Sequence, residues 1–471
     1  MNRFSIIILL FSVGFSKADE TPPQVQKLEL MGNRFFTFNT IVRVNQIEAT
    51  RNENHGTDES SIHTSKEART FREAIDAAWP GAKITWAFSW LSLNDQSENY
   101  SEIRKLVVSY HEKYGDEITF IPGGYFANMY NSREQVNRDL HDGLQLVSKM
   151  VGGGYRPKSV VAGFLSSENL RYLAEEEGIH VCQGNIWSQY AVDNGDGEGS
   201  VCYPYYPSRQ HFCKPAQDKK DLIDCVNLDG WTVDFLCARI AGSKMVDGVK
   251  YRSRQGVGPI ETVIWLGTEE GTKSMLATTA AHFDDGFKRN GFAWVNCGWE
   301  LGLVEARKLY NYNGRNGMEG LSIWFKETRK RWPDAKFITM GEFGELWRAH
   351  YKSNDDINYQ FMQRGSGVRG SIEELEIRWF MNKDFRLALL KNWKEGTQEK
   401  VIDFTRYDLT EKEPEDPKPG VHGRNWSLMN VLNQKGIRPQ DKPTPLNELS
   451  EEDQARIKAR YPELFVTPIS K

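Results

Sequence analysis

The chain has little excess charge of either sign. Its 60 basic residues stand against 64 acidic ones, a formal net charge of −4 over 471 residues. Proteins that bind nucleic acid or anionic membranes electrostatically carry a marked positive excess. After the N-terminal segment, no apolar run is long enough to cross a bilayer. We therefore expect no nucleic-acid partner and no membrane insertion of the processed chain.

Several motifs are also missing. No predicted strand is followed by Gly-x-Gly-x-x-Gly, and the glycines at 123–124 and 152–154 are typical of turns and helix ends. There is no Gly-x-Ser-x-Gly elbow, and no cysteine lies in a recognisable peptidase motif. These absences disfavour a dinucleotide enzyme, a phosphate-binding loop, and catalysis by a serine or cysteine nucleophile.

Cysteine is scarce for a chain of this length. The six cysteines are Cys182, Cys202, Cys213, Cys225, Cys237 and Cys297. None forms a Cys-x-x-Cys pair, so a thiolate metal site is disfavoured. An oxidising compartment would allow up to three bridges, of which Cys202 with Cys213 closes a plausible short loop. Cys237 lies in an apolar helical context, which predicts a buried free thiol.

The N-terminus has the pattern of an export signal. Arg3 precedes an apolar stretch at 4–15, and Ser16 and Ala18 supply small residues before a cleavage point. We expect residues 1–18 to be a signal peptide and the protein to be periplasmic or secreted. An exported protein with 14 Trp and 18 Tyr suits an external polymer such as a glycan, because flat aromatic rings stack on sugars.

Strand and helix patterns alternate along most of the chain. Expected strands share β-branched or aromatic residues and lie at 35–44, 83–90, 117–124, 159–165, 179–184, 223–228, 292–297 and 336–340. Helical patterns follow them, and a Gly- and Tyr-rich insertion occupies 193–221. This order predicts an α/β fold, a (β/α)7-8 parallel barrel over 19–357. A doubly wound sheet is the alternative. Alternating strands after residue 358 predict a small β-rich accessory region over 358–471.

Parts of the sequence resemble a known superfamily. The helix at 132–151, the Gly154–Pro157 turn, the segment 173–179 and the ending 337–343 are similar to the glycoside hydrolase and polysaccharide deacetylase barrels. The whole chain, with its stretch 229–235, also resembles a secreted bacterial family of unknown function. The resemblance implies a barrel acting on carbohydrate.

The deacetylase metal site does not carry over with this resemblance. That superfamily's deacetylases have an aspartate pair at the first strand and a histidine pair after the second. Here Asn39 ends the first strand without an aspartate pair, and His63 has no partner in the required spacing. His282, Asp284 and Asp285 come late, on a helical segment.

Carboxylates at predicted strand ends are the candidates for catalysis, because chemistry sits at that edge of a parallel barrel. Glu300 stands out, between Gly298 and Gly302 and next to a tryptophan. We predict Glu300 and Glu168 as a hydrolytic pair, with Asp229 in reserve. Glu168 and Glu342 also suit a first helical turn, and Asp229 suits an N-cap, so each has a purely structural explanation.

Further residues are predicted to bind substrate or, in the alternative function, a metal. The expected substrate contacts are Trp90, Trp187, Trp231, Trp299, Tyr206, His282 and Asp285. No metal is expected. The alternative is a divalent ion bound by His282, Asp284 and Asp285 or by His55 and His63. The segment 193–198 lacks the twelve-residue calcium-loop pattern.

These observations lead to three functions in order of preference. The first is an exported glycoside hydrolase using strand-end carboxylates on a polysaccharide or oligosaccharide. The second is a divalent-metal polysaccharide deacetylase, and the third a glycan-binding barrel without catalysis. The sequence leaves the sugar, the linkage and the oligomeric state open.

Overall fold

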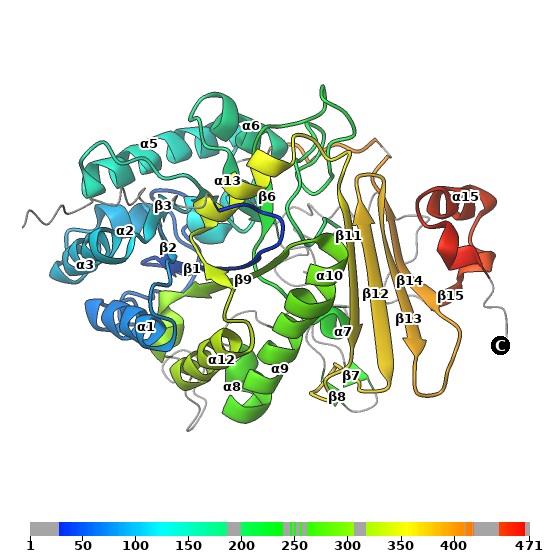
Figure 1. The fold of residues 1–471 in the computed structure, drawn as a ribbon. Coiled ribbons are helices and arrows are strands. Elements are labelled where there is room, and N and C mark those ends of the chain that lie inside the picture. Colours follow the sequence, from blue (N-terminus) through cyan, green and yellow to red (C-terminus); the bar gives the residue numbers. More distant parts are fainter. Residues whose placement is uncertain are drawn as a thin grey trace, which may run out of the picture.

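The computed structural model describes residues 28–185, 199–238, 245–246, 249–250, 255–256, 261–305, 317–408, 410–416, 418 and 442–466. The predicted signal peptide, Trp187 and the segment 193–198 lie outside these residues. Within them, parallel sheets with covering helices form one part, and an antiparallel sheet stands beside it (Figure 1).

The first parallel sheet carries the candidate site. Its strands are β1 (Arg34–Val42), β2 (Thr85–Phe88), β3 (Glu117–Phe120), β9 (Ala293–Glu300) and β10 (Lys336–Phe337). β1 pairs with β9 along its length, while β10 and then β2 pair with its start and its end. The register matches Asn39 with Gly298 and Ile41 with Glu300. The carboxyl ends of β1 and β9 therefore meet at one edge.

The second parallel sheet contains β4 (Val160–Val161), β5 (Val181–Asn185) and β6 (Val226–Asp229). The expected closed barrel is not formed among the described residues. β4 has only two residues in its ladder, and no strand pairing joins β3 to β4. Between β6 and β9, the Asn296 side chain donates to the carbonyls of Asp229 and Gly230 in place of a backbone ladder. The described fold is a mixed α/β arrangement of two parallel sheets.

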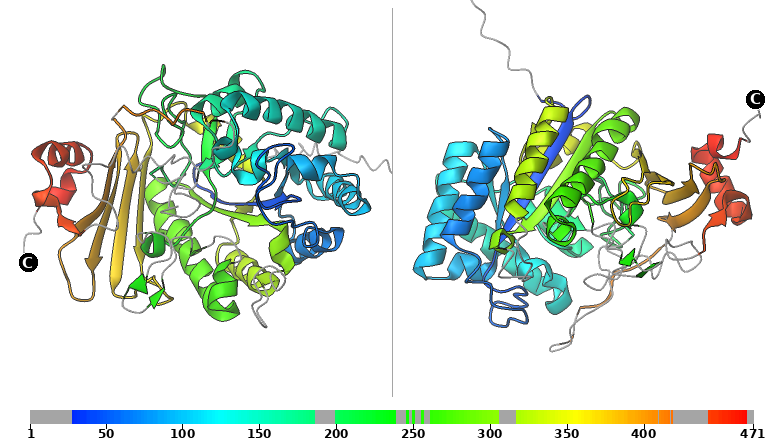
Figure 2. Two further views of the ribbon diagram at one scale, coloured as in Figure 1. Left: turned by 180° about the vertical axis from the view of Figure 1, so that it is seen from behind. Right: turned by 90° about the horizontal axis from the view of Figure 1, so that it is seen from below.

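Helices cover the parallel sheets (Figures 1 and 2). They are α1 (Ser65–Ala78), α2 (Trp90–Asn94), α3 (Glu98–Tyr114), η1 (Pro122–Tyr125), α4 (Ala127–Tyr130), α5 (Arg133–Val151), α6 (Ser167–Glu175), α7 (Phe235–Ala238), α8 (Glu261–Leu266), α9 (Thr268–Ala280), η3 (Ala281–Gly286), α10 (Phe287–Asn290), η4 (Leu301–Glu305), α12 (Gly317–Arg331) and α13 (Met340–His350). Ser and Thr side chains cap the first turns of α1, α3, α5, α6 and α13. Aromatic contacts such as Phe36 with Trp324 and Phe38 with Phe71 fix helices against the sheet.

The antiparallel sheet confirms the predicted β-rich C-terminal region. Its strands are β11 (Asn358–Arg364), β12 (Leu375–Asn382), β13 (Phe385–Asn392), β14 (Lys400–Arg406) and β15 (Thr444–Pro445). Ile377, Trp379 and Met381 of β12 belong to the large core shared with the α/β part. Phe380 instead packs in a second core with Ile457 of α15 (Glu451–Arg460). The sheet thus lies between the α/β part and α15 (Figure 1).

The remaining short elements are the hairpin of β7 (Met245–Val246) and β8 (Val249–Lys250), and the turns η5 (Leu446–Glu448) and η6 (Pro462–Phe465). No described helix is both long and apolar enough to cross a membrane. All six cysteines are buried, and Cys202 is a free thiol. The predicted Cys202–Cys213 bridge is therefore absent.

Candidate functional site

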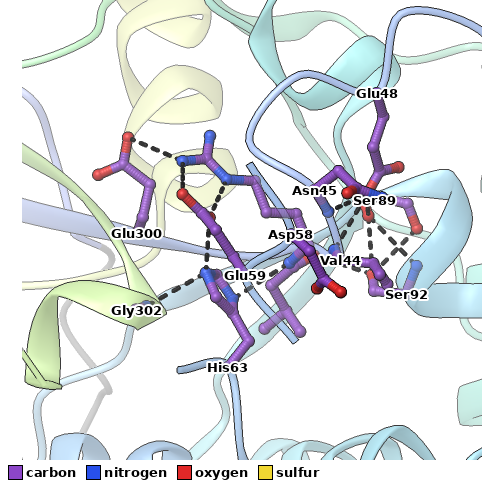
Figure 3. A network of polar contacts seen from close by, with 12 residues as sticks. Val44, Asn45, Glu48, Asp58, Glu59, His63, Ser89, Ser92, Glu300 and Gly302 are labelled. Atoms are coloured by element: carbon purple, nitrogen blue, oxygen red, sulfur yellow. Dashed lines mark hydrogen bonds and ion pairs between the residues drawn. The ribbon is translucent and has the colours of Figure 1, made fainter. Parts of the chain in front are cut away.

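Glu300 lies at the carboxyl edge of the first sheet, as the last residue of β9. Its side chain is 23% exposed, so the carboxylate is partly open to solvent at this edge. Its Oε1 lies 3.9 Å from Nη2 of Arg43, the residue that follows β1 (Figure 3). Because β1 and β9 are paired in register up to Ile41 and Glu300, the sheet itself brings the two charges together.

A second carboxylate holds Arg43 in place. The Arg43 guanidinium donates from Nε to Glu59 Oε2 at 2.7 Å and from Nη2 to Glu59 Oε1 at 3.1 Å. Both side chains are almost fully buried. Burial alone would lower the pKa of Arg43, but the charges of Glu300 and Glu59 outweigh it and raise that pKa. Arg43 is therefore a permanent cation beside Glu300.

His63 completes this cluster as a neutral ring. Its Nδ1 accepts a hydrogen bond from the Arg43 amide, and its Nε2 lies 3.2 Å from Glu59 Oε2 and 3.3 Å from the Gly302 amide, which donates to it. Burial lowers the pKa of His63 despite the nearby carboxylate. Burial alone would raise the pKa of Glu59, but the His63 hydrogen bond and the Arg43 charge hold it at about 2. Glu59 is thus ionised, and both of its carboxylate oxygens are engaged by Arg43 and His63.

A network around Glu48 shapes the loop that follows β1 (Figure 3). The buried Glu48 carboxylate accepts from the Ser89 hydroxyl at 2.7 Å and from the amides of Val44 and Leu91. Burial raises the pKa of Glu48, and these donors oppose that shift. Glu48 is therefore committed to holding the chain after β1 against the end of β2.

Tyr125 has an unusual backbone at the end of β3. Its φ is +103°, the only positive value among non-glycine residues that the structure describes, and it follows Gly123 and Gly124 with φ of +60° and +57°. A Cβ on Gly163, after β4, would lie 2.6 Å from the Tyr125 carbonyl oxygen. Tyr125 also acts electrostatically on Arg43. Strained residues of this kind cluster at functional sites, which adds Tyr125 to the candidates.

The structure does not bring Glu300, Glu168 and Asp229 together as the sequence analysis expected. Asn296 donates to the Asp229 carbonyl, which places Asp229 level with a residue four positions before Glu300. Asp229 is buried, whereas Glu168 is exposed in the first turn of α6.

Glu168 instead lines a separate pocket of about 400 Å³ near the starts of α5 and α6. Arg133, Arg209 and Glu413 also line this pocket. The Glu413 carboxylate accepts from the amide of Ser167, next to Glu168. No hydrogen bond or ion pair of the described residues links Glu168 to Glu300.

The predicted substrate contacts are scattered. Trp90 is half-buried near the end of β2, where Arg51 lies 3.7 Å over its ring. Trp299 is only 1% exposed and packs against Phe38 and Phe71 on the helix-covered face, because it alternates with Glu300 along β9. This placement corrects the expectation that Trp299 faces a ligand.

Three more predicted contacts are buried in the core. Tyr206 packs on Trp347 and donates to the Tyr351 carbonyl. Trp231 is 4% exposed. His282 lies between Tyr203 and Phe235, and burial lowers its pKa to about 3. These residues are not presented to an external glycan.

The residues expected to bind a metal in the deacetylase alternative are also engaged in separate contacts. Asp284 accepts from the Trp332 indole, and Asp285 from Arg289 and the Met362 amide, while His282 points into the core. His55 stacks on Tyr130 and pairs with Glu53, whereas His63 is buried against Arg43 and Glu59. In the part of the chain that the structure describes, no group of three His, Cys, Asp or Glu side chains is arranged to hold a metal ion.

Sequence reasoning missed Arg43, Glu59 and Tyr125, and assigned His63 only to a hypothetical metal. A signal existed for Arg43, because a cation directly after a buried strand is unusual. The Glu59–His63 spacing of four residues was visible too, but the segment around it has no helical pattern that would fix its geometry.

Comparison with known proteins places the chain in a family. Residues 28–381 match the domain of unknown function DUF3863, and residues 386–464 match DUF3864. A crystal structure from Parabacteroides distasonis, provisionally described as a glycoside hydrolase/deacetylase, is 49% identical over 93% of this chain and 100% of that chain, with a TM-score of 0.87. None of the curated proteins matches.

Two further solved structures match at low identity. A GH57-type branching enzyme from Pyrococcus horikoshii is 10% identical over 66% of this chain and 70% of that chain, with a TM-score of 0.39. Peptidoglycan deacetylase PdaC from Bacillus subtilis is 8% identical over 68% and 93%, with a TM-score of 0.30. Such values assign no function. The match over residues 28–381 and the 49% identical structure show that the chain belongs to the DUF3863 family.

Proposed function

We propose that this chain is an exported glycoside hydrolase, acting on a polysaccharide or oligosaccharide, with Glu300 as its reacting carboxylate. The observation that carries the proposal is the position of Glu300, partly exposed at the shared end of β1 and β9 and 3.9 Å from the buried cation of Arg43. Parallel α/β folds collect their chemistry at this edge.

The other acidic groups near this edge are engaged elsewhere. Glu59 takes two hydrogen bonds from Arg43, and Glu48 binds backbone amides. Glu342 lies at the opposite edge, beside the start of β2, where it accepts from the Thr339 amide in a capping box and pairs with Lys83 at 2.6 Å. Among the residues that the structure describes, Glu300 has a single ion-pair contact, the 3.9 Å one with Arg43, so its carboxylate oxygens are available to a substrate.

The chemistry follows from this arrangement. Hydrolysis adds water across the glycosidic bond, so positive charge develops at the anomeric carbon and the leaving oxygen gains a proton. Glu300 supplies the carboxylate that attacks that carbon or takes the proton of the attacking water, and the leaving oxygen takes its proton from solvent water. Arg43, fixed by Glu59, orients the Glu300 carboxylate and stabilises its negative charge. Preorganised charges of this kind cost no rearrangement during reaction.

The test is hydrolysis of a glycan panel by purified protein of residues 19–471, with and without EDTA. Reducing ends and released acetate are measured together. We expect chelator-insensitive release of reducing ends, lowered by about 10²–10⁴-fold in Glu300→Gln. Acetate release lost on chelation, with no new reducing ends, would replace the proposal with the deacetylase.

Glu342→Gln is the matched control. It makes the same chemical change in a carboxylate away from the proposed site, one that caps the first turn of α13 and pairs with Lys83. We expect its rate to equal that of the unmodified protein. An equal loss of rate in both variants would show that Glu300 acts through stability and not through chemistry.

A further inference from the structure

Asn39 is a buried amide without a partner. It lies on β1 with no exposed surface, and in the part of the chain that the structure describes neither Nδ2 nor Oδ1 has a hydrogen-bond partner. A primary amide offers two donor hydrogens and an acceptor oxygen. Leaving such groups unpaired in a core costs free energy, and native proteins rarely keep them so. The amide therefore offers two donor hydrogens and an acceptor oxygen that no described residue uses.

A neighbouring asparagine shows that the fold can satisfy such an amide. Asn296 on β9 is equally buried. Its Oδ1 accepts from the Thr37 hydroxyl at 2.8 Å, and its Nδ2 donates to the carbonyls of Asp229 and Gly230 at 2.8 and 2.7 Å. Two asparagines in one interior thus differ completely in their hydrogen bonding.

The position of Asn39 links it to Glu300. Asn39 is paired with Gly298, and a Cβ on Gly298 would lie 3.1 Å from Asn39 Oδ1 and 3.1 Å from the Gly230 carbonyl oxygen. The amide therefore lies on the face of β9 to which residue 298 points. Glu300, two residues further on, points to the same face, about 7 Å along the strand. Because residue 298 is glycine, the Asn39 amide and the Gly230 carbonyl can approach the β9 backbone closely on this face.

We propose that Asn39 is the sugar-recognising residue at the floor of the Glu300 site, and that its amide binds two adjacent hydroxyl groups of a neutral sugar. This inference rests on the proposed function and names its substrate class. One hydroxyl accepts from Nδ2 while its neighbour donates to Oδ1, so a vicinal diol satisfies the amide in both senses.

The charge of the site selects a neutral sugar. Two carboxyl groups, Glu59 and Glu300, stand against the single guanidinium of Arg43, and the His63 ring is neutral. The surplus is negative, and it opposes the approach of carboxylated or sulfated glycans. Neutral hexose or pentose polymers with free adjacent hydroxyls fit both features.

The experiment uses Glu300→Gln protein, so that turnover does not obscure binding, on an array of glucans, mannans, galactans and xylans. We expect binding to at least one of these neutral polymers, and at least a tenfold loss of affinity when Asn39→Leu is added. Leucine has a similar size and removes the polar atoms. Retained affinity within twofold, or binding to acidic glycans only, would overturn the inference, as would no binding to any neutral polymer.

Thermal unfolding separates a ligand site from a structural amide. An unpaired amide reserved for ligand predicts that Asn39→Leu raises Tm or leaves it unchanged, while Asn296→Leu, which breaks satisfied bonds, lowers it. An equal drop in both variants would show that Asn39 holds a buried water for stability, and would overturn the inference. Because binding is measured without turnover, failure of Glu300 as the reacting group and failure of Asn39 as the sugar contact give different results.

Discussion

Arg43 and Glu59 form a bidentate ion pair in which the guanidinium side chain is 6% exposed and the carboxylate side chain 3%. Removing one partner of such a pair leaves a buried charge uncompensated, which costs about 3–5 kcal/mol. We expect Glu59→Gln to lower the free energy of unfolding by that amount, measured by urea denaturation. Glu53→Gln, at an exposed carboxylate, should change it by less than about 0.5 kcal/mol. Equal urea midpoints for both variants would contradict this account.

The same pair predicts an acid limit to stability. The pKa of Glu59 is about 2 in the folded protein, against an ordinary value of 4.5. A depressed pKa adds stability that is present above the ordinary value and is lost as the pH falls through the folded value. We expect the urea midpoint of the protein to fall between pH 4.5 and 2 by an amount that Glu59→Gln does not show. Parallel pH profiles for the two proteins would refute it.

His282 predicts a second loss that starts at higher pH. Burial holds its pKa at about 3 in the folded state, against 6.5 ordinarily. Below pH 6.5 the unfolded chain takes up a proton that the folded chain refuses, so stability declines by about 1.4 kcal/mol per pH unit until about pH 3. His282→Phe keeps an aromatic ring between Tyr203 and Phe235 and should flatten this slope. An unchanged slope in guanidinium or urea titrations would count against a neutral, buried His282.

Glu413 fastens the segment 410–416 to the start of α6. Its Oε1 accepts from the amides of Ser167 and Phe212 at 2.7 and 2.9 Å, and its Oε2 pairs with Arg133. We expect Glu413→Ala to free this segment and to increase the rate of limited proteolysis there several-fold, located by mass spectrometry. Glu411→Ala, at a neighbouring carboxylate, should leave the rate unchanged. Equal cleavage of both variants would show that the segment is held by other contacts.

Burial of the cysteines makes a further prediction. Cys182, Cys202, Cys225 and Cys297 are enclosed in the core, and burial raises the pKa of each thiol. Because the thiolate is the reactive form, a thiol-specific reagent should leave these residues unmodified in the folded protein and label them after unfolding. Peptide mapping identifies the labelled residues. Rapid labelling of Cys202 in the native state would contradict its enclosure.

Much of the secondary structure could be predicted from local sequence patterns. The alternation in residues 35–44 anticipated β1, and the helical pattern at 132–151 anticipated α5. The predicted barrel closure, which depends on contacts between distant segments, is not confirmed among the residues that the structure describes. The two-residue β4 and the side-chain bridge of Asn296 have no signature in the chain itself.

The candidate site also contains residues whose position follows from local sequence and residues that only the folded chain brings together. The position of Glu300 at the end of a strand could be predicted because a strand end is a local feature of the sequence. The structure places its carboxylate at the sheet edge. Trp299 was misplaced by one step of the strand alternation, which turns it to the opposite face. The Arg43–Glu59–His63 cluster joins a strand to a loop without regular structure, so only the folded chain shows it.

The two family matches meet between residues 381 and 386, in the short connection that joins β12 to β13. These strands are hydrogen-bonded neighbours, with Trp379 opposite Ala388 and Phe380 opposite Leu387. Cutting the chain there would leave each fragment with an open strand edge, a template for aggregation. The boundary between the two family matches is therefore unsuited to domain recombination and to the end of an expression clone. We expect the two parts to be inherited together and to fold as one unit.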